Sequence, residues 1–124
     1  MAKRILLVDD EPDTIHVVEK RLQLSGYEVI TSYDGQDALD KARKEKPDLI
    51  ILDLMLPKMD GYKVCGLLKA DTRYAAIPII LFSARADESD RQMGLEVKAN
   101  AYITKPFDHQ VLLDKISELL TPKQ

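Results

Sequence analysis

Five short apolar runs, separated by segments with helical spacing, dominate the hydrophobic pattern of the chain. They lie at residues 4–8, 27–31, 49–52, 77–82 and 101–104 and read RILLV, YEVIT, LIIL, IPIILF and AYIT. Most of the runs are continuous, as in strands that are covered on both faces, whereas residues 27–31 alternate and indicate an edge strand. The pattern predicts the strands of a parallel sheet that is covered by the segments between them.

The segments between the runs predict helices that begin and end at suitable residues. Pro12 suits a first helical turn and Gly26 a helix end, while Asp34, Asp60 and Asp108 suit N-caps. Each of these helices is expected to bury one apolar face. The residues expected on the buried faces are Ile15, Val18, Leu22, Ala38, Leu39, Ala42, Val64, Leu67, Leu68, Leu112, Ile116 and Leu119. With a further helix around residues 87–95, whose apolar stripe is thin, the alternation predicts an α/β fold: a doubly wound, five-stranded parallel sheet with helices on both faces.

Length, charge and cysteine content narrow the class of protein. The chain has 124 residues, of which 45% are hydrophobic, and this suits one domain with a substantial core. The net charge is −3 and no basic stripe is present, so direct binding of nucleic acid is not expected. The apolar runs are too short to span a membrane, and Cys65, as the single cysteine, cannot form an internal disulfide. A cytoplasmic location is the simplest expectation.

The residues that follow four of the five runs carry candidate chemistry. Because the carboxyl ends of parallel strands meet at one edge of a sheet, these residues are expected to lie close together. They are Asp9 and Asp10 after the first run, Asp53 after the third, Ser83 after the fourth and Lys105 after the fifth. The second run ends in Ser32 and Tyr33, which have no strong chemical signature.

This group of residues favours phosphoryl chemistry with a divalent cation. Carboxylates without histidine or cysteine suit a hard cation such as Mg²⁺, which typically works beside a phosphoryl group. Asp53 follows a buried strand and is the better candidate nucleophile, whereas Asp9 and Asp10 are the better metal ligands. Lys105 could neutralise charge on the phosphoryl group, and the hydroxyl of Ser83 could donate a hydrogen bond to it.

Four segments of the chain, ILLVDDEP, PDLIILDLMLPKMDGY, IPIILFSA and AYITKPF, occur in this order. Together they resemble the receiver domain of two-component response regulators, the CheY-like superfamily, over essentially the whole chain. The resemblance implies a (βα)5 flavodoxin-like fold with strand order 2-1-3-4-5 and a single receiver domain over residues 1–124. It implies that Asp53 accepts a phosphoryl group from a sensor histidine kinase or a phosphotransfer protein. Such a domain is not a conventional enzyme, because it catalyses only its own phosphorylation and dephosphorylation.

The resemblance also implies a role for each residue of the site. Asp10, Asp53 and the backbone carbonyl of Met55 would bind Mg²⁺ or Mn²⁺, and Asp9 would act through water. Lys105 would contact the phosphoryl group, and Ser83 and Tyr102 would act as switch residues. The peptide bond between Lys105 and Pro106 would be cis. Phosphorylation is then expected to alter the face made by the fourth helix, fifth strand and fifth helix, which would control a downstream protein or an output domain.

Two alternatives compete with a phosphorylated switch. A receiver fold could serve only as an interaction scaffold that is never phosphorylated, with its site residues retained by inheritance. LIILDLM is also similar to the opening motif of haloacid dehalogenase-type phosphatases, but that motif requires a second aspartate where this chain has Met55. Without an attached output domain, a receiver is expected to work by docking to another protein.

Overall fold

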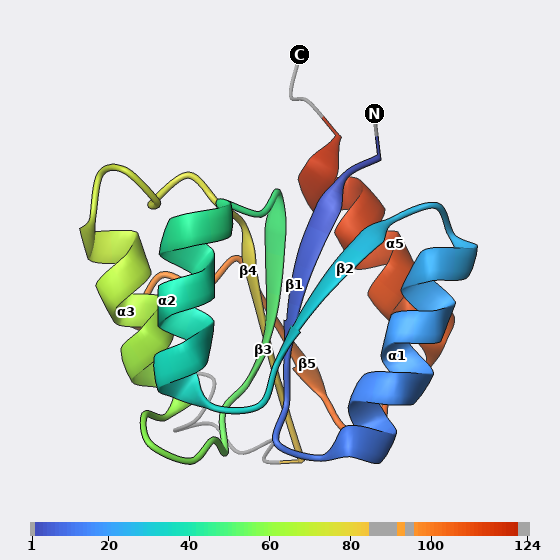
Figure 1. Cartoon of the computed structure of the whole chain (residues 1–124), viewed down its shortest axis with the longest axis horizontal. Helices are drawn as coiled ribbons and strands as arrows, with labels where there is room; N and C mark the ends of the chain where they lie inside the picture. The colour runs from blue at the N-terminus through green and yellow to red at the C-terminus, as the bar shows by residue number, and fades with distance from the viewer. Residues whose placement is uncertain (1, 85–91, 94–95, 122–124) are drawn as a thin grey trace.

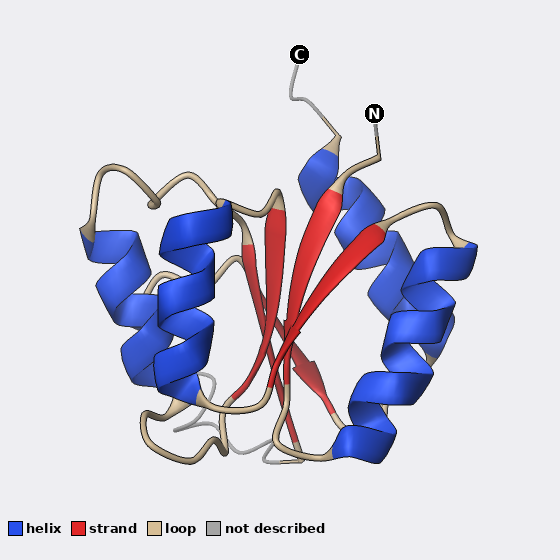
Figure 2. Cartoon of the chain, viewed as in Figure 1, coloured by secondary structure: helices blue, strands red, loops and turns tan. Residues whose placement is uncertain are grey.

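The computed structural model describes residues 2–84, 92–93 and 96–121, and these contain a five-stranded parallel sheet in the order β2-β1-β3-β4-β5. The strands are β1 (Arg4–Val8), β2 (Glu28–Ser32), β3 (Leu49–Asp53), β4 (Ile79–Ser83) and β5 (Ala101–Thr104). The order confirms the predicted sheet and places the alternating strand β2 at an edge. Figure 2 shows the twisted sheet between two layers of helices.

Four described helices cover the sheet, two on each face (Figure 1). They are α1 (Pro12–Leu24), α2 (Gly35–Glu45), α3 (Gly61–Ala70) and α5 (His109–Leu120). Helices α1 and α5 lie on one face, and α2 and α3 lie on the other (Figure 1). The predicted helix over residues 87–95 falls almost entirely outside the described residues. Among the described residues, no helix has both the length and the apolar character needed to cross a membrane.

Side-chain capping explains where three of the helices begin. Asp34, Asp60 and Asp108 are the N-caps of α2, α3 and α5, and each carboxylate accepts a backbone N–H from the first turn of its helix. Such caps typically stabilise a helix by about 1 kcal/mol, because they satisfy N–H groups that have no partner within the helix. Helix α1 begins differently, with Pro12 in its first turn and no side-chain cap.

Two apolar cores form, one on each face of the sheet. The side chains of β1 and β3 alternate between the two cores, so both strands are buried along their whole apolar length. Ten of the twelve residues expected on the buried helix faces are buried, and Leu119 is half-buried against the core that α1 and α5 cover. Leu67 is 38% exposed, and the neighbouring Cys65 is fully buried in its place. The prediction for Leu67 was therefore wrong, because the face of α3 that packs on the sheet is centred on Val64, Cys65 and Leu68.

Two strands begin later than the apolar runs predict. Tyr27 donates its N–H to the carbonyl of Leu22 at 3.1 Å and so belongs to the turn that follows α1. Ile77 donates its N–H to the carbonyl of Tyr74 at 3.0 Å and so belongs to the preceding turn. An N–H that is used in a local turn is not available to the sheet, which moves the starts of β2 and β4 to Glu28 and Ile79.

Candidate functional site

Three carboxylates meet at the carboxyl edge of the sheet. Val8 pairs with Leu52 in the β1–β3 register, so Asp9 and Asp53 lie side by side at the ends of the two central strands. Asp10 follows directly, and one carboxylate oxygen from each of the three aspartates lies within 4.8 Å of the others. Asp9 is 0% exposed and Asp53 is 4% exposed, whereas Asp10 is open to solvent. The prediction that the aspartates following these strands lie close together is therefore confirmed.

Lys105 supplies a positive charge to the two buried carboxylates. Its Nζ lies 2.8 Å from Oδ2 of Asp9 and 3.2 Å from Oδ2 of Asp53. The backbone N–H of Lys105 donates to the carbonyl of Ser83 at 2.7 Å, so the end of β4 fixes where this side chain starts. The ammonium also lies 4.5 Å from the ring centroid of Phe82. One cation thus serves two buried anions, with the charge of Asp10 beside them.

Burial and neighbouring charges shift the pKa values of Asp53 and Lys105. Burial raises the pKa of the Asp53 carboxyl above its ordinary value of 3.8, against the opposing effects of the Met55 N–H and the Lys105 charge. Burial alone would lower the pKa of the Lys105 ammonium, but the two carboxylates outweigh it, so that pKa is raised. Lys105 therefore stays charged at neutral pH, and the ionised form of Asp53 is held in an environment that disfavours it.

The segment between β3 and α3 carries Met55 past the acidic cluster. Met55 donates its N–H to Oδ1 of Asp53 at 3.1 Å, so the two oxygens of Asp53 contact different partners. Met55 is 59% exposed. Its predicted role in the site belongs to its backbone carbonyl and does not involve its side chain. The N–H of Gly61 donates to the carbonyl of Leu54 at 3.0 Å and closes the segment where α3 begins.

The remaining predicted site residues also lie at or near this edge. Ser83 ends β4 and is 1% exposed, and its register partner is Thr104, which ends β5. The Lys105–Pro106 peptide bond is cis. Tyr102 lies within β5 and packs against the core that α2 and α3 cover. The roles proposed for these residues in switching stay predictions.

The carboxylate group fits a hard divalent cation. Three oxygen donors within 4.8 Å of one another match what Mg²⁺ requires, which is a small number of carboxylates with the remaining positions taken by water. The exposed carboxylate of Asp10 leaves the group open to solvent on one side. A cation bound there and the ammonium of Lys105 would contact the same carboxylates. The two positive charges would together neutralise Asp9 and Asp53.

An apolar cavity of about 500 Å³ opens beside the site. It lies between the N-terminal half of α1 and the segment that connects β5 to α5. Its lining residues include Val17, Ala84, Lys105, Pro106 and Phe107. Since Lys105 belongs to both the cavity wall and the charged cluster, a molecule entering this cavity would reach the edge of the site.

One residue that the sequence did not single out takes part in the site. Ser32 ends β2 and is 0% exposed, and its carbonyl accepts the N–H of Asp9 at 3.2 Å. Its hydroxyl donates to Oδ2 of Asp37 at 2.7 Å. The only sequence signal was a serine at a strand end, which is common in proteins without a special role.

Comparisons with known proteins agree with this geometry. Residues 5–117 match the family model of the response regulator receiver domain. The chain is 44% identical over 120 residues to the alkaline phosphatase synthesis transcriptional regulatory protein of Bacillus subtilis (strain 168), covering 97% of this chain and 49% of the relative. The chain thus spans about half the length of the curated relatives that it matches.

Solved structures give the same result. The chemotaxis protein CheY4 of Vibrio cholerae superimposes with a TM-score of 0.90 at 32% identity, covering 97% of this chain and 100% of that one. The receiver domain of a sensor histidine kinase from Pseudomonas aeruginosa PAO1 superimposes with a TM-score of 0.89 at 32% identity, covering 97% of this chain and 98% of that one. The latter structure contains a magnesium ion coordinated in its active-site cleft.

Proposed function

The chain belongs to the response regulator receiver domain family of two-component systems, a signalling rather than a catalytic family, and from that premise we propose that it is a Mg²⁺-dependent phosphoryl acceptor. Asp53 is the proposed acceptor. The observation that carries the proposal is the ammonium of Lys105 shared by two buried carboxylates, with its Nζ at 2.8 Å from Asp9 and 3.2 Å from Asp53. Such a group is costly to fold, so its presence needs a functional reason.

The proposed reaction transfers a phosphoryl group to an oxygen of Asp53. That oxygen forms a bond to phosphorus while the bond from phosphorus to a donor nitrogen breaks, and the electron pair stays on the donor imidazole. The donor is a phosphohistidine of a sensor histidine kinase or a phosphotransfer protein. Transfer of this kind requires alignment and neutralisation of charge more than covalent help from the protein. Lys105 supplies a fixed positive charge beside the acceptor, because its Nζ lies 3.2 Å from Oδ2 of Asp53.

The proposed metal ligands are Asp10, Asp53 and the backbone carbonyl of Met55, with Asp9 acting through water. A bound Mg²⁺ or Mn²⁺ would supply positive charge to the phosphoryl oxygens. Asp10 is the exposed member of the carboxylate group and is open to an entering hydrated ion. Asp9 is already engaged, because its Oδ1 accepts the N–H of Glu11 at 2.9 Å and its Oδ2 contacts Lys105. The exposure of Asp10 therefore supports a direct role for this residue in metal binding.

Phosphorylation is proposed to act as a switch. It adds a charge of about −1.5 to −2 beside Ser83 at the end of β4. The hydroxyl of Ser83 would donate to the phosphoryl group, and Tyr102, in the neighbouring strand, would change its packing in response. The altered surface would include β5 and α5 and would control a downstream protein or an output domain. Support for regulatory output comes from the relative named as a transcriptional regulatory protein, of which this chain covers 49%.

A mass measurement tests the proposal. The protein is incubated with acetyl phosphate and Mg²⁺, and the intact chain is weighed beside an EDTA control and the variant Asp53→Asn. We expect one added phosphoryl group that requires both Mg²⁺ and Asp53. A chain that gains no phosphoryl group, and whose amide spectrum is unchanged by beryllofluoride, would overturn the proposal and favour a receiver fold that serves only as a scaffold.

A further inference from the structure

The turn between β2 and α2 (residues 32–35) touches both segments that carry the carboxylate group. On one side, the carbonyl of Ser32 accepts the N–H of Asp9 at 3.2 Å. On the other side, the N–H of Gly35 donates to the carbonyl of Pro57 at 3.1 Å, in the segment that begins with Met55. Asp9 and the segment after Asp53 are therefore both hydrogen-bonded to one short turn, although none of its residues belongs to the carboxylate group.

Gly35 allows the second of these contacts. A Cβ added at Gly35 would lie 2.6 Å from the carbonyl carbon of Met59 and 2.8 Å from its Cβ, and closer still to its carbonyl oxygen. Backbone atoms of a packed segment cannot give way as the end of a flexible side chain can. Any side chain at position 35 would therefore push residues 57–59 away from the turn.

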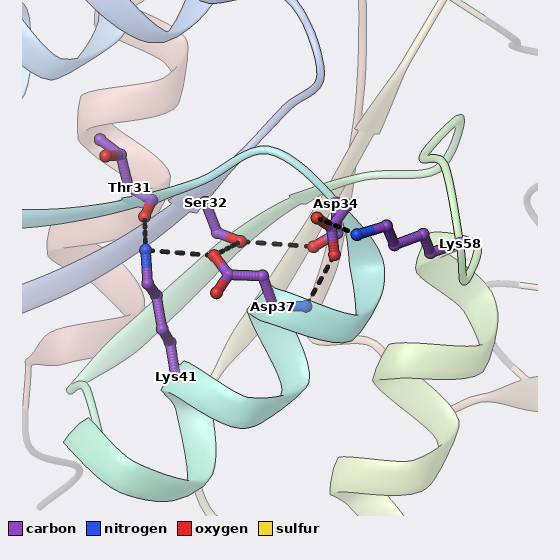
Figure 3. Close-up of polar contacts among 6 residues, drawn as sticks. All are labelled: Thr31, Ser32, Asp34, Asp37, Lys41 and Lys58. Atoms are coloured by element: carbon purple, nitrogen blue, oxygen red, sulfur yellow. Dashed lines mark hydrogen bonds and ion pairs between the residues drawn. The ribbon is translucent and has the colours of Figure 1, made fainter.

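Polar contacts hold the turn in its shape, as Figure 3 shows. The hydroxyl of the buried Ser32 donates to Asp37 at 2.7 Å, and Nζ of Lys41 lies 3.1 Å from the same carboxylate oxygen. Asp34 caps α2 through Oδ1, which accepts the N–H of Asp37 at 2.7 Å. Its Oδ2 lies 3.7 Å from Nζ of Lys58, in the segment that follows β3 (Figure 3). The turn is thus tied both to α2 and to that segment.

We propose that the turn at residues 32–35 is a positioning element that sets the separation between Asp9 and the segment carrying Met55, and that Gly35 and Ser32 thereby determine the affinity for Mg²⁺. This inference rests on the proposed function, because it assumes that the carboxylates and the Met55 carbonyl hold the ion. A metal site with few protein ligands depends strongly on the spacing of those ligands. Changing residues that orient the ligands typically weakens metal binding by about 10- to 100-fold.

Two variants without a change of charge test the proposal. Gly35→Ala displaces residues 57–59, and we expect its dissociation constant for Mg²⁺ to rise by about tenfold. Ser32→Ala removes the hydrogen bond to Asp37 but keeps the carbonyl that accepts from Asp9, and we expect a smaller rise of about threefold. Binding is measured by titrating Mg²⁺ into the full chain and following backbone amide shifts, which needs no phosphorylation. The same spectra show whether the amides of Gly35 and Met59 have moved in the metal-free protein.

Two other glycines provide matched controls. Gly26 has a φ of +93° with no atom within 4 Å of an added Cβ, so Gly26→Ala strains the backbone far from the turn. Gly66 lies in α3, where an added Cβ makes an ordinary contact at 3.6 Å with Val97. We expect Gly26→Ala to lower the unfolding midpoint and Gly66→Ala to leave the fold intact. Both should bind Mg²⁺ within about twofold of the unaltered chain, as distant sites do.

The outcomes separate the inference from the proposed function. If the unaltered chain binds Mg²⁺ and both Gly35→Ala and Ser32→Ala bind within about twofold of it, the positioning role is wrong while the metal site stands. If Gly26→Ala weakens binding as much as Gly35→Ala, the effect is general destabilisation and the positioning role is also wrong. Should Gly35→Ala fail to fold, Ser32→Ala decides the question alone. If the unaltered chain shows no saturable Mg²⁺ binding, the proposed function fails and the inference fails with it.

Discussion

Replacing Asp53 by asparagine should stabilise the protein when no divalent cation is present. Lys105 contacts two carboxylates that are 0% and 5% exposed at the side chain, and the third carboxylate lies beside them. The variant Asp53→Asn removes one of these anions and keeps the 2.8 Å pair between Lys105 and Asp9. The remaining pair is then balanced, with one cation facing one buried anion.

The pKa of Asp53 fixes the sign of the effect. Because burial raises this pKa above 3.8 in the folded state, the unfolded chain releases the proton first as the pH rises. The stability associated with Asp53 is therefore highest below pH 3.8 and is lost as the pH rises through the folded-state pKa. At neutral pH the ionised carboxylate lowers the free energy of unfolding, by about 1.4 kcal/mol for each pH unit that separates the folded-state pKa from the unfolded-state pKa.

Asparagine removes the destabilising charge, but it also loses one hydrogen bond that the carboxylate makes. Its single amide oxygen can accept from either Met55 or Lys105, and losing one such bond costs about 0.5–1.5 kcal/mol. We expect a net gain in stability, because relieving a buried charge outweighs the loss of one hydrogen bond. Each 1 kcal/mol of that gain raises the thermal midpoint of a domain of this size by about 4 °C.

Thermal unfolding followed by circular dichroism, in EDTA and in Mg²⁺, provides the assay. Mg²⁺ at ten times its dissociation constant should stabilise the unaltered chain by about 1.4 kcal/mol and the variant by less, since the variant lacks one charged ligand. Asp40→Asn, an exposed substitution on α2, controls for general loss of negative charge. An Asp53→Asn variant that is less stable than the unaltered chain in EDTA, or that gains no more than Asp40→Asn does, would refute the expected relief of buried charge.

Other contacts in the structure give three further predictions. Lys105→Met leaves both buried carboxylates without their ammonium, so it should lower the free energy of unfolding in EDTA by about 3 kcal/mol, measured by urea denaturation; an unchanged midpoint would contradict this. Lys46→Gly should raise that free energy by about 1 kcal/mol, because Lys46 has a φ of 45° at the end of α2; a loss of stability would count against it. Burial raises the pKa of Cys65 from 9.0 to about 11, so stability should fall as the pH rises between these values, by about 3 kcal/mol in total; an equal fall in Cys65→Ala would show that another group is responsible.

The fold and the acidic group could be predicted because both follow from local signals. Continuous apolar runs define buried strands, and an aspartate directly before each of three helices marks where that helix begins. Once the strands are parallel, the residues after them must meet at one edge, which brought Asp9, Asp10 and Asp53 together without knowledge of any contact.

The contacts around the turn at residues 32–35 could not be predicted in the same way. Gly35 matters because residues 57–59 approach its Cα closely, and that approach depends on how two distant segments pack. Ser32 is a similar case, because its carbonyl faces Asp9 only in the β1–β2 register that the structure adopts. Leu67 was assigned to the wrong side of α3 because several residues of that helix are apolar, so the spacing alone did not define its buried face.

Asn100 links the starts of two neighbouring strands. It stands in the segment VKANAY, just before β5. The structure gives it two hydrogen bonds to Ile79, one from the backbone N–H and one to the side-chain Oδ1, both at 2.9 Å. These bonds hold the start of β5 against the start of β4, at the end of the sheet opposite the carboxylate group.

Locating the phosphoryl group on a single side chain tests the central claim most directly. The chain is treated with acetyl phosphate and Mg²⁺ and then with borohydride, which reduces an acyl phosphate to an alcohol and converts aspartate to homoserine. The peptides are then sequenced by mass spectrometry. We expect homoserine at position 53, and none when Mg²⁺ is omitted. Homoserine at position 9 or 10 instead, or none at any position of a folded chain, would contradict the assignment of Asp53 as the acceptor.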